Sequence, residues 1–451
     1  MDRVSQPAPS FEEALRFWWR LGFISFGGPA GQIAIMHREL VERFHWISER
    51  RFLHALNYCM VLPGPEAQQL ATYIGWLMHG TRGGIVAGGL FVLPSHFILI
   101  ALSWVYMRFG TVPAVAALLY GVKPAVVAIV LAAAWRIGSR TLRHPLLFGI
   151  AALAFVALAI MAVPFPLVIA GAAVLGVAGA RFAPSVFRIG AHAPKDPSTG
   201  PALIDDDTAA PPHARFSAPR LSLIVAIFMA IWAGALGALA AVYGWDGDFT
   251  QMARFFTQAA LLTFGGAYAV LPYVLQGAVE QYGWLSAPQM IDGLALGETT
   301  PGPLIMVVAF VGFLGGWTKQ LLGGDALLMA GIVGACVATF FTFLPSFLFI
   351  LAGGPLVERT RDDLKLTAPL TAITAAVVGV IVNLAVYFAM HVFWPESTST
   401  APLSGRFDLA SVVIAVAATA VLVTRRADVI AVIAASGFAG LALWMAGYGA
   451  V

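Results

Sequence analysis

Long apolar stretches joined by short polar loops make up most of the chain. A helix needs roughly 20 mostly apolar residues to cross a bilayer, and these stretches reach or approach that length. They predict an all-α, polytopic membrane protein. The predicted spans are 14–36, 53–79, 83–107, 111–135, 146–162, 164–180, 221–243, 255–278, 290–317, 326–353, 367–393, 408–424 and 428–450.

Two of the predicted spans are interrupted by a Pro-Gly-Pro triplet. These triplets are Pro63-Gly64-Pro65 within 53–79 and Pro301-Gly302-Pro303 within 290–317. Proline removes a backbone donor and clashes with the preceding turn of a helix, and glycine adds backbone freedom. Each triplet therefore predicts either a broken transmembrane helix or a re-entrant hairpin.

A polar, proline-rich segment divides the chain into two similar parts. We expect an N-terminal transporter repeat at 1–180, a cytoplasmic linker at 181–220, a connecting transmembrane helix at 221–250 and a second repeat at 251–451. Phe-Gly-Gly, Trp-[Ile/Leu]-Ser and Pro-Gly-Pro recur in both parts at one offset of 238 residues. An odd number of predicted spans separates the starts of the two repeats. The second repeat is therefore predicted to be inverted relative to the first, as in many secondary transporters.

The composition agrees with a membrane protein and argues against other classes. Hydrophobic residues make up 59% of the chain and charged residues 11%, whereas soluble domains carry about 25% charged residues. A net charge of +3 without a basic stripe gives no support for nucleic-acid binding. Sequence motifs for nucleotide, zinc-protease or hydrolase chemistry do not occur, so we expect no enzyme activity, no cofactor and no metal site.

The positions of Lys and Arg predict which loops face the cytoplasm. Loops 136–145, 181–220, 354–366 and 425–427 are rich in these residues and fall on one side if every span crosses. Loop 37–52 is also basic, and it joins that side only if 53–79 is re-entrant. The sequence thus leaves the orientation of the N-terminus open.

The half-helices that flank the triplets form the predicted substrate site. The first turn of a helix exposes unpaired N–H groups and the positive end of the helix dipole, which favour anions. Hydroxyl and amide side chains beside the triplets are further hydrogen-bond donors. The candidate substrate-binding residues are Pro63, Gly64, Pro65, Gln68, Gln69, Lys123, Thr299, Thr300, Pro301, Gly302 and Pro303.

Glu66, Glu298 and Lys123 are charged residues inside predicted spans. An unpaired charge at the bilayer centre costs ~2.5–3.5 kcal/mol or more, so such residues normally line a polar pathway. We interpret Glu66 and Glu298 as proton-coupling or gating groups; a structural alternative makes Glu66 a partner of its own helix dipole. Lys123 either attracts an anion or pairs with one of these two glutamates.

Two glycine pairs occupy matching positions in the repeats, Gly27-Gly28 and Gly265-Gly266. Small residues allow helices to pack closely, and glycine also allows the backbone to approach a substrate. The sequence does not choose between helix packing and backbone approach.

Longer strings around these positions resemble the bacterial chromate ion transporter (CHR) family. In the first half they are Leu62-Pro63-Gly64-Pro65-Glu66-Ala67-Gln68-Gln69-Leu70-Ala71 and Gly121-Val122-Lys123-Pro124-Ala125-Val126-Val127. In the second half the string is Glu298-Thr299-Thr300-Pro301-Gly302-Pro303-Leu304. The resemblance covers both halves, as in the long, two-domain ChrA-type members.

The resemblance implies a multi-pass protein of the bacterial plasma membrane that exports chromate and confers chromate resistance. It also implies sulfate as a competitor and protons as coupling partners, and a homo-oligomer is compatible with the sequence. One alternative is a transporter of sulfate or another oxyanion. A different class is an intramembrane enzyme acting on a phospho-lipid, with Glu66 and Glu298 as acid and base.

Overall fold

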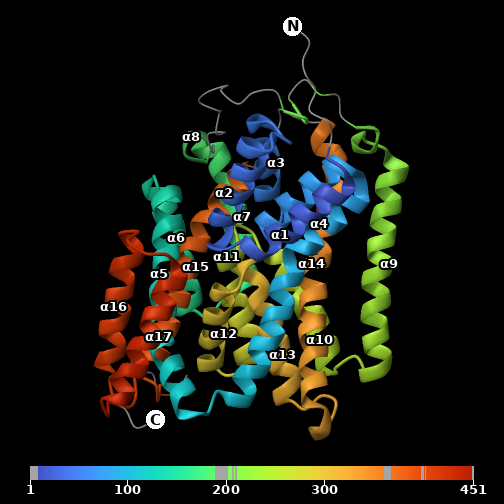
Figure 1. Ribbon diagram of the computed structural model, residues 1–451. Helices are drawn as coiled ribbons and strands as arrows, with labels where there is room; N and C mark the ends of the chain where they lie inside the picture. Colours follow the sequence, from blue (N-terminus) through green and yellow to red (C-terminus); the bar gives the residue numbers. More distant parts are fainter. Residues whose placement is uncertain are drawn as a thin grey trace.

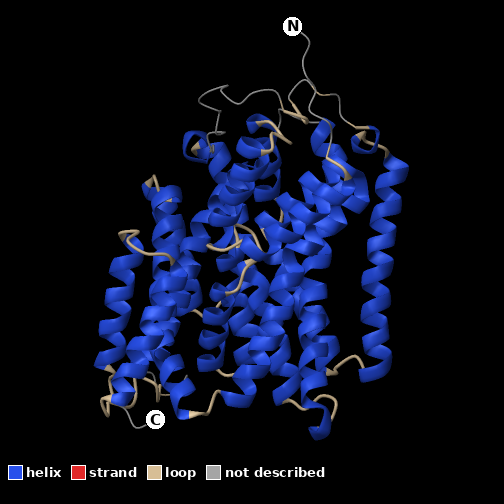
Figure 2. Ribbon diagram, viewed as in Figure 1, coloured by secondary structure: helices blue, strands red, loops and turns tan. Residues whose placement is uncertain are grey.

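The computed structural model describes residues 9–187, 202–205, 208, 211–359, 367–397, 401 and 403–448. Most of the predicted linker, including Asp206 and Asp207, lies outside the described residues. Regular structure within the described residues is helical, apart from one bridge between Ile47 and Ile204 (Figure 2). The predicted all-α class is therefore confirmed.

The N-terminal half starts with short helices and continues with long ones (Figure 1). Its elements are α1 (Phe11–Ile24), α2 (Gly28–His37), the π-helix η1 (Arg38–Arg43), α3 (Glu49–Val61), α4 (Glu66–Phe109), α5 (Pro113–Thr141), α6 (Pro145–Ala159), α7 (Phe165–Phe182) and α8 (Pro184–Phe187). The 3-10 turn η2 (Pro212–Ala214) and the long helix α9 (Ala218–Tyr243) lead to the second half.

The C-terminal half repeats this order. Its elements are α10 (Asp248–Leu262), α11 (Ala267–Leu275), the π-helix η3 (Gln276–Gln281), α12 (Ala287–Thr299), η4 (Leu304–Met306), α13 (Val307–Thr318), η5 (Gly324–Ala326), α14 (Leu327–Arg359), α15 (Thr367–Phe393), α16 (Leu409–Val423) and α17 (Val429–Met445). The two π-helices, and likewise α3 and α12, begin and end 238 residues apart. This shared element order supports the predicted internal repeat.

Matching caps explain why α3 and α12 begin at equivalent positions. The Ser48 hydroxyl accepts a hydrogen bond from the Arg51 N–H, and the Ser286 hydroxyl accepts one from the Gln289 N–H. A serine at this position satisfies one of the N–H groups that a helix start leaves unpaired. The Trp-[Ile/Leu]-Ser motif thus marks a helix start in each half.

Within the described residues, six helices are long and apolar enough to cross a membrane. They are Glu66–Phe109, Pro113–Thr141, Phe165–Phe182, Ala218–Tyr243, Gly324–Glu358 and Ala368–Phe393. Helices α6, α16 and α17 are apolar but shorter. Together they make the chain a multi-pass membrane protein.

The segment containing the first Pro-Gly-Pro triplet is a re-entrant hairpin. At its start the Ser48 N–H donates to the Ile204 carbonyl (3.0 Å), and near its end His213 bonds the Trp76 carbonyl (2.8 Å). Ile204 and His213 belong to one short connection before α9. Both ends of 49–79 therefore lie on one face of the protein.

Helix α4 reverses direction at His79 and Gly80, which leave the helical conformation. The stretches before and after this bend pack against each other through glycine: a Cβ at Gly75 would lie 2.6 Å from the Gly83 carbonyl oxygen. Small residues let two helix backbones approach this closely. Only the second stretch crosses to the other face.

Stretch 14–36 is a hairpin as well, and its prediction as one continuous span is wrong. Helix α1 ends at Ile24, and α2 begins after Gly27. At the start of α1, His79 bonds the Pro9 carbonyl (3.1 Å), and at the end of α2, His37 contacts Glu49 at the start of α3. Both ends of this hairpin therefore lie on the face that carries the ends of 49–79.

The second Pro-Gly-Pro segment is built in the same way. The Thr318 hydroxyl at the end of α13 donates to the carbonyl of Trp284 (2.9 Å), which lies just before α12. The segment 284–318 therefore also returns to the face from which it starts.

These hairpins resolve the conflict over loop 37–52, because it shares a face with the connection before α9. Seven predicted spans separate the starts of the two repeats, and two of them, 14–36 and 53–79, do not cross. The number of crossings between the two starts is therefore still odd, and the opposite orientation of the repeats stays a prediction. Figure 1 places the described start of the chain and its C-terminal end at opposite ends of the molecule.

Single cysteines at exposed residues test this topology in a background without the native cysteines. We expect Arg50→Cys and Arg82→Cys to be labelled by an impermeant maleimide from one side of the membrane, because they flank the first Pro-Gly-Pro hairpin. Arg108→Cys, Gln281→Cys and Gln320→Cys are expected to be labelled from the other side. Labelling of Gln320→Cys from the same side as Arg82→Cys would contradict the inverted arrangement.

Candidate functional site

The breaks in the two halves are joined by reciprocal backbone hydrogen bonds. The Gly64 N–H of the first triplet donates to the Thr263 carbonyl at the end of α10 (2.7 Å). The Gly302 N–H of the second triplet donates to the Ser25 carbonyl at the end of α1 (2.8 Å). Gly64 and Gly302 occupy equivalent positions, and so do Ser25 and Thr263. Each triplet thus lies against the helix break of the other half.

The triplets also pack on equivalent serines of the opposite half. A Cβ at Gly64 would clash with the Ser346 hydroxyl of α14, and one at Gly302 would lie 2.9 Å from the Ser95 Cβ of α4. Both glycines have positive φ (+126° and +98°), a conformation that L side chains rarely adopt. Glycine is therefore required at each of these two positions for two reasons: the backbone conformation disfavours other residues, and there is no space for a side chain.

The two glycine pairs form turns. Gly27, Gly28, Gly265 and Gly266 all have positive φ. A Cβ at Gly28 would meet no atom within 4 Å, and one at Gly266 would meet only the Glu66 Oε1, at 4.0 Å. This geometry favours backbone approach over helix packing as the role of these pairs, and that role stays a prediction. The pairs break the helices and leave open space beside the new helix starts.

Four helix starts at these breaks have no side-chain cap: those of α2, α4, α11 and η4. Their first N–H groups lack helical acceptors and are donors for an anion. Gly266 places the start of α11 next to Glu66 at the start of α4, and α11 also contacts η4. These breaks therefore bring uncapped helix starts from both halves into one region.

Glu66 and Glu298 have different surroundings in that region. Glu66 is partly exposed, and within the described part of the chain its carboxylate takes part in no hydrogen bond or ion pair. Glu298 is buried and accepts a hydrogen bond from the Tyr268 hydroxyl of α11. The positive charge of Arg136 on α5 also acts on Glu298. Glu66 is thus open to a ligand or a proton, whereas Glu298 already has partners.

Several predicted donors bond the protein itself. The Gln69 amide donates to the Pro63 carbonyl (2.8 Å), and the Gln68 amide donates to the Thr72 hydroxyl (3.0 Å). Gln68 also packs beside Gly88 and away from the triplet. The hydroxyls of Thr299 and Thr300 donate to carbonyls of α12 (2.8 and 2.9 Å). Backbone N–H groups are therefore better placed than these side chains to bind an anion.

Lys123 pairs with an acid that the sequence interpretation did not select. Its Nζ lies 3.8 Å from the Asp292 Oδ2, and the Tyr106 hydroxyl donates to the same oxygen (2.9 Å). Asp292 is buried in α12, and its second oxygen has no hydrogen-bond partner among the described residues. The pairing of Lys123 with Glu66 or Glu298 is therefore wrong. A search for acids inside predicted span 290–317 would have found Asp292.

A second buried ion pair joins the two halves near the ends of the first Pro-Gly-Pro hairpin. Arg51 of α3 donates to Glu358 at the end of α14 (2.9 Å), and the Tyr73 hydroxyl of α4 donates to the other Glu358 oxygen. The side chains of Arg51 and Glu358 are only 5% and 2% exposed. This network fixes the hairpin to α14. The sequence offered no signal for it, because Arg51 lies in a basic loop and Glu358 at a helix end.

Comparison with known proteins identifies relatives over most of the chain. The sequence model described as "Chromate transporter" matches residues 13–177 and 250–441. The unmatched residues between these segments contain the linker and α9.

Three relatives carry chromate in their names. A chromate transport protein of Pseudomonas aeruginosa is 33% identical, covering 83% of this chain and 80% of the relative. A chromate transport protein of Cupriavidus metallidurans is 28% identical, covering 85% and 84%. A probable chromate transport protein of Synechococcus elongatus is 29% identical, covering 83% and 84%. No solved structure matches the chain.

The Lys123–Asp292 pair predicts coupled stability effects. We expect Lys123→Met and Asp292→Asn each to lower the apparent melting temperature of the detergent-purified protein, because each leaves a group that has lost its ionic partner. Removing one partner of a buried pair costs about 3–5 kcal/mol, and the partial exposure of Lys123 places the effect at or below that range.

The double variant Lys123→Met/Asp292→Asn is expected to recover part of the loss, with a coupling of roughly 0.5–3 kcal/mol. The exposed Lys319→Met variant is the matched control and is expected to melt like the wild type. Strictly additive losses in the double variant would show that the two residues do not interact.

Proposed function

The chain belongs to the chromate transporter family and lies in the bacterial plasma membrane, and we propose that it exports chromate across that membrane as a secondary transporter. The observation that carries this proposal is the family match, which extends over both halves. The names of the three relatives support chromate as the substrate. They also favour a transporter over an enzyme acting on a phospho-lipid.

We place the chromate site at the helix breaks. Removing an isolated dianion from water costs tens of kcal/mol by Born estimates, and a charge-assisted hydrogen bond returns only about 1.5–3 kcal/mol. A chromate site therefore needs several donors together. The uncapped starts of α2, α4, α11 and η4 supply N–H groups from both halves. In this proposal Lys123, the partner of Asp292, and Arg136, which acts on Glu298, supply the positive charge.

The membrane potential is sufficient to drive export of a dianion. One charge moving through 100 mV gains ~2.3 kcal/mol, so a dianion leaving through roughly 150 mV, inside negative, gains about 7 kcal/mol. This corresponds to about five decades of concentration ratio. The driving force thus lets a selective gated pathway export chromate without a coupling ion.

Proton coupling is an additional part of the proposal and rests on Glu66. Its carboxylate is the open acid at the α4 start, so protonation there changes the charge that an arriving anion meets. Lys123 contributes in a second way, because an anion that attracts Lys123 competes with Asp292 for it. Antiport requires proton and anion to occupy the site at different steps.

Everted membrane vesicles test the substrate and the driving force. Export then appears as uptake, and we expect uptake of labelled chromate to rise when the vesicle lumen is made positive. Sulfate is measured in parallel, at two pH values and two imposed potentials. Uptake of sulfate but not of chromate would favour the alternative function, a sulfate transporter. Chromate uptake that does not change with the imposed membrane potential would rule out electrogenic export.

The same vesicles test the carboxylates. We propose both Glu66 and Glu298 as coupling groups, and we expect Glu66→Gln and Glu298→Gln to flatten the pH dependence of chromate uptake, because glutamine cannot take up or release a proton. The larger effect is expected for Glu66, whose carboxylate has no partner within the described residues. Glu42→Gln, which changes an exposed glutamate away from the helix breaks, is the matched control and is expected to keep the wild-type profile. A wild-type pH profile in both Glu66→Gln and Glu298→Gln would exclude these residues as the coupling groups.

A further inference from the structure

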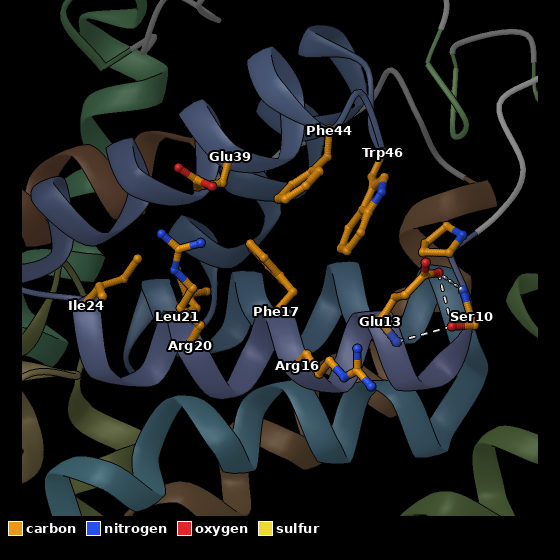
Figure 3. A pocket seen from close by; sticks show the side chains of 11 residues that line it. Ser10, Glu13, Arg16, Phe17, Arg20, Leu21, Ile24, Glu39, Phe44 and Trp46 are labelled. Carbon is orange, nitrogen blue, oxygen red and sulfur yellow. Dashed lines mark hydrogen bonds between the residues drawn. The ribbon is translucent and has the colours of Figure 1, made fainter.

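A cavity of about 570 Å³ lies between α1 and the chain segment 39–46 and extends along α1 to Ile24, its last residue (Figure 3). One wall is aromatic: the Phe17 ring lies 5.8 Å from Phe44 and 5.2 Å from Trp46, and Phe44 stacks on Trp46 at 5.0 Å. Arg20 and Glu39 are polar residues of the lining. The cavity thus combines an apolar wall with charged groups.

Of the charged residues that line the cavity, Glu13 bonds Ser10 and Arg16 bonds Glu12, which leaves Arg20 for a ligand. Glu39 is already engaged by Arg43 (2.9 Å) and lies 3.7 Å from Arg38. Arg20 is exposed, and within the described part of the chain it takes part in no hydrogen bond or ion pair. An unpaired guanidinium beside an apolar wall is suited to a phosphate that carries an apolar group, because the guanidinium binds phosphate oxygens through two parallel N–H bonds.

Helix α1 carries, next to this cavity, an exposed apolar stripe that is suited to contact lipid. One stripe of α1 is apolar and uncovered by the protein: Phe11, Leu15, Trp19 and Phe23 are 38–51% exposed. Residues at i, i+4 and i+8 share a helix face, and so Glu12, Arg16 and Arg20 form the neighbouring row. The helix is therefore amphipathic, with this charged row, which contains Arg16 and Arg20, next to the exposed apolar stripe. Basic residues on such helices lie where lipid phosphates are found.

The second half fills the equivalent space with its own side chains. Phe255, Tyr282 and Trp284 correspond to Phe17, Phe44 and Trp46, and Phe255 stacks on Tyr273 at 4.9 Å. A Cβ at Gly277 would clash with the Phe255 ring, so this packing requires glycine.

The first half has Glu39 in place of Gly277 and Arg20 in place of Gln258. A larger side chain at position 39 prevents the equivalent packing of Phe17. The open space and Arg20 therefore occur together in the first half, whereas Phe255 packs on Tyr273 and Gly277 at the equivalent place in the second half, which has Gln258 in place of Arg20.

We propose that this cavity binds the headgroup of an anionic phospholipid. The lipid phosphate bonds Arg20, the glycerol region covers Phe17 and Trp46, and an acyl chain follows the exposed stripe of α1. This inference does not depend on the transported substrate, because the residues that line the cavity include neither Pro-Gly-Pro triplet.

Binding is tested on the full-length, detergent-purified protein by the rise in melting temperature with increasing lipid, since a ligand of the folded state stabilises it by mass action. We expect short-chain phosphatidylglycerol to stabilise the wild type and short-chain phosphatidylcholine to have a much weaker effect. Arg20→Gln, which installs the residue of the second half, should raise the half-saturating phosphatidylglycerol concentration by roughly tenfold or more. Arg82→Gln, an exposed arginine near the same face, is the control and should respond like the wild type.

Inorganic phosphate and chromate separate a lipid site from a simple anion site. Stabilisation by phosphate equal to that by phosphatidylglycerol, lost in Arg20→Gln, would overturn the lipid proposal. If chromate binds at the helix breaks, it should stabilise the wild type and Arg20→Gln equally. A missing chromate effect would therefore count against the transport proposal and leave the lipid proposal unaffected.

Two further variants keep the test decisive if Arg20→Gln is poorly folded. Arg20→Lys keeps the charge and should retain most of the phosphatidylglycerol effect. Ile24→Trp fills the cavity while leaving Arg20 in place and should abolish the effect. An unchanged lipid response in Ile24→Trp would show that phosphatidylglycerol binds elsewhere.

Discussion

The need to satisfy backbone groups at broken helices constrains this structure most strongly. Hydrocarbon offers no hydrogen bonds, so an unpaired N–H or C=O group there costs several kcal/mol. Gly64 and Gly302 each donate to a carbonyl at a helix break of the opposite half. Neither half supplies the acceptor for its own triplet. The two halves are therefore interdependent, and the breaks gather where the halves meet.

The same requirement applies to buried charges. Glu298 is bonded by Tyr268, and Asp292 by Tyr106 and Lys123. Glu358 is bonded by Arg51 and Tyr73 in the same way. Glu66 differs from these acids because within the described residues it has no such partner. This contrast distinguishes the acids that are bonded to other parts of the protein from Glu66, whose carboxylate has no such partner within the described residues.

The repeats share a backbone plan and differ in chemistry. Glu66 follows the first triplet and Glu298 precedes the second, so the two acids do not occupy equivalent positions. Arg20 and Glu39 likewise correspond to Gln258 and Gly277. The helix breaks supply backbone N–H donors from both halves. The side chains that differ between equivalent positions give the two halves different charges and different polar groups.

The sequence by itself determined the helical class, the breaks at the Pro-Gly-Pro triplets and the family, and it predicted the internal repeat, because apolar length, proline, glycine and motif spacing are local properties. The sequence also identified Glu66, Glu298 and Lys123 as candidate site residues, because a charged side chain inside an apolar span carries a free-energy cost. Tertiary structure decided that 14–36 and 53–79 are hairpins, that the glycine pairs form turns, and that Lys123 meets Asp292. These outcomes depend on contacts between residues far apart in the chain, and local hydrophobicity carries no information about which distant group satisfies a buried donor, acceptor or charge.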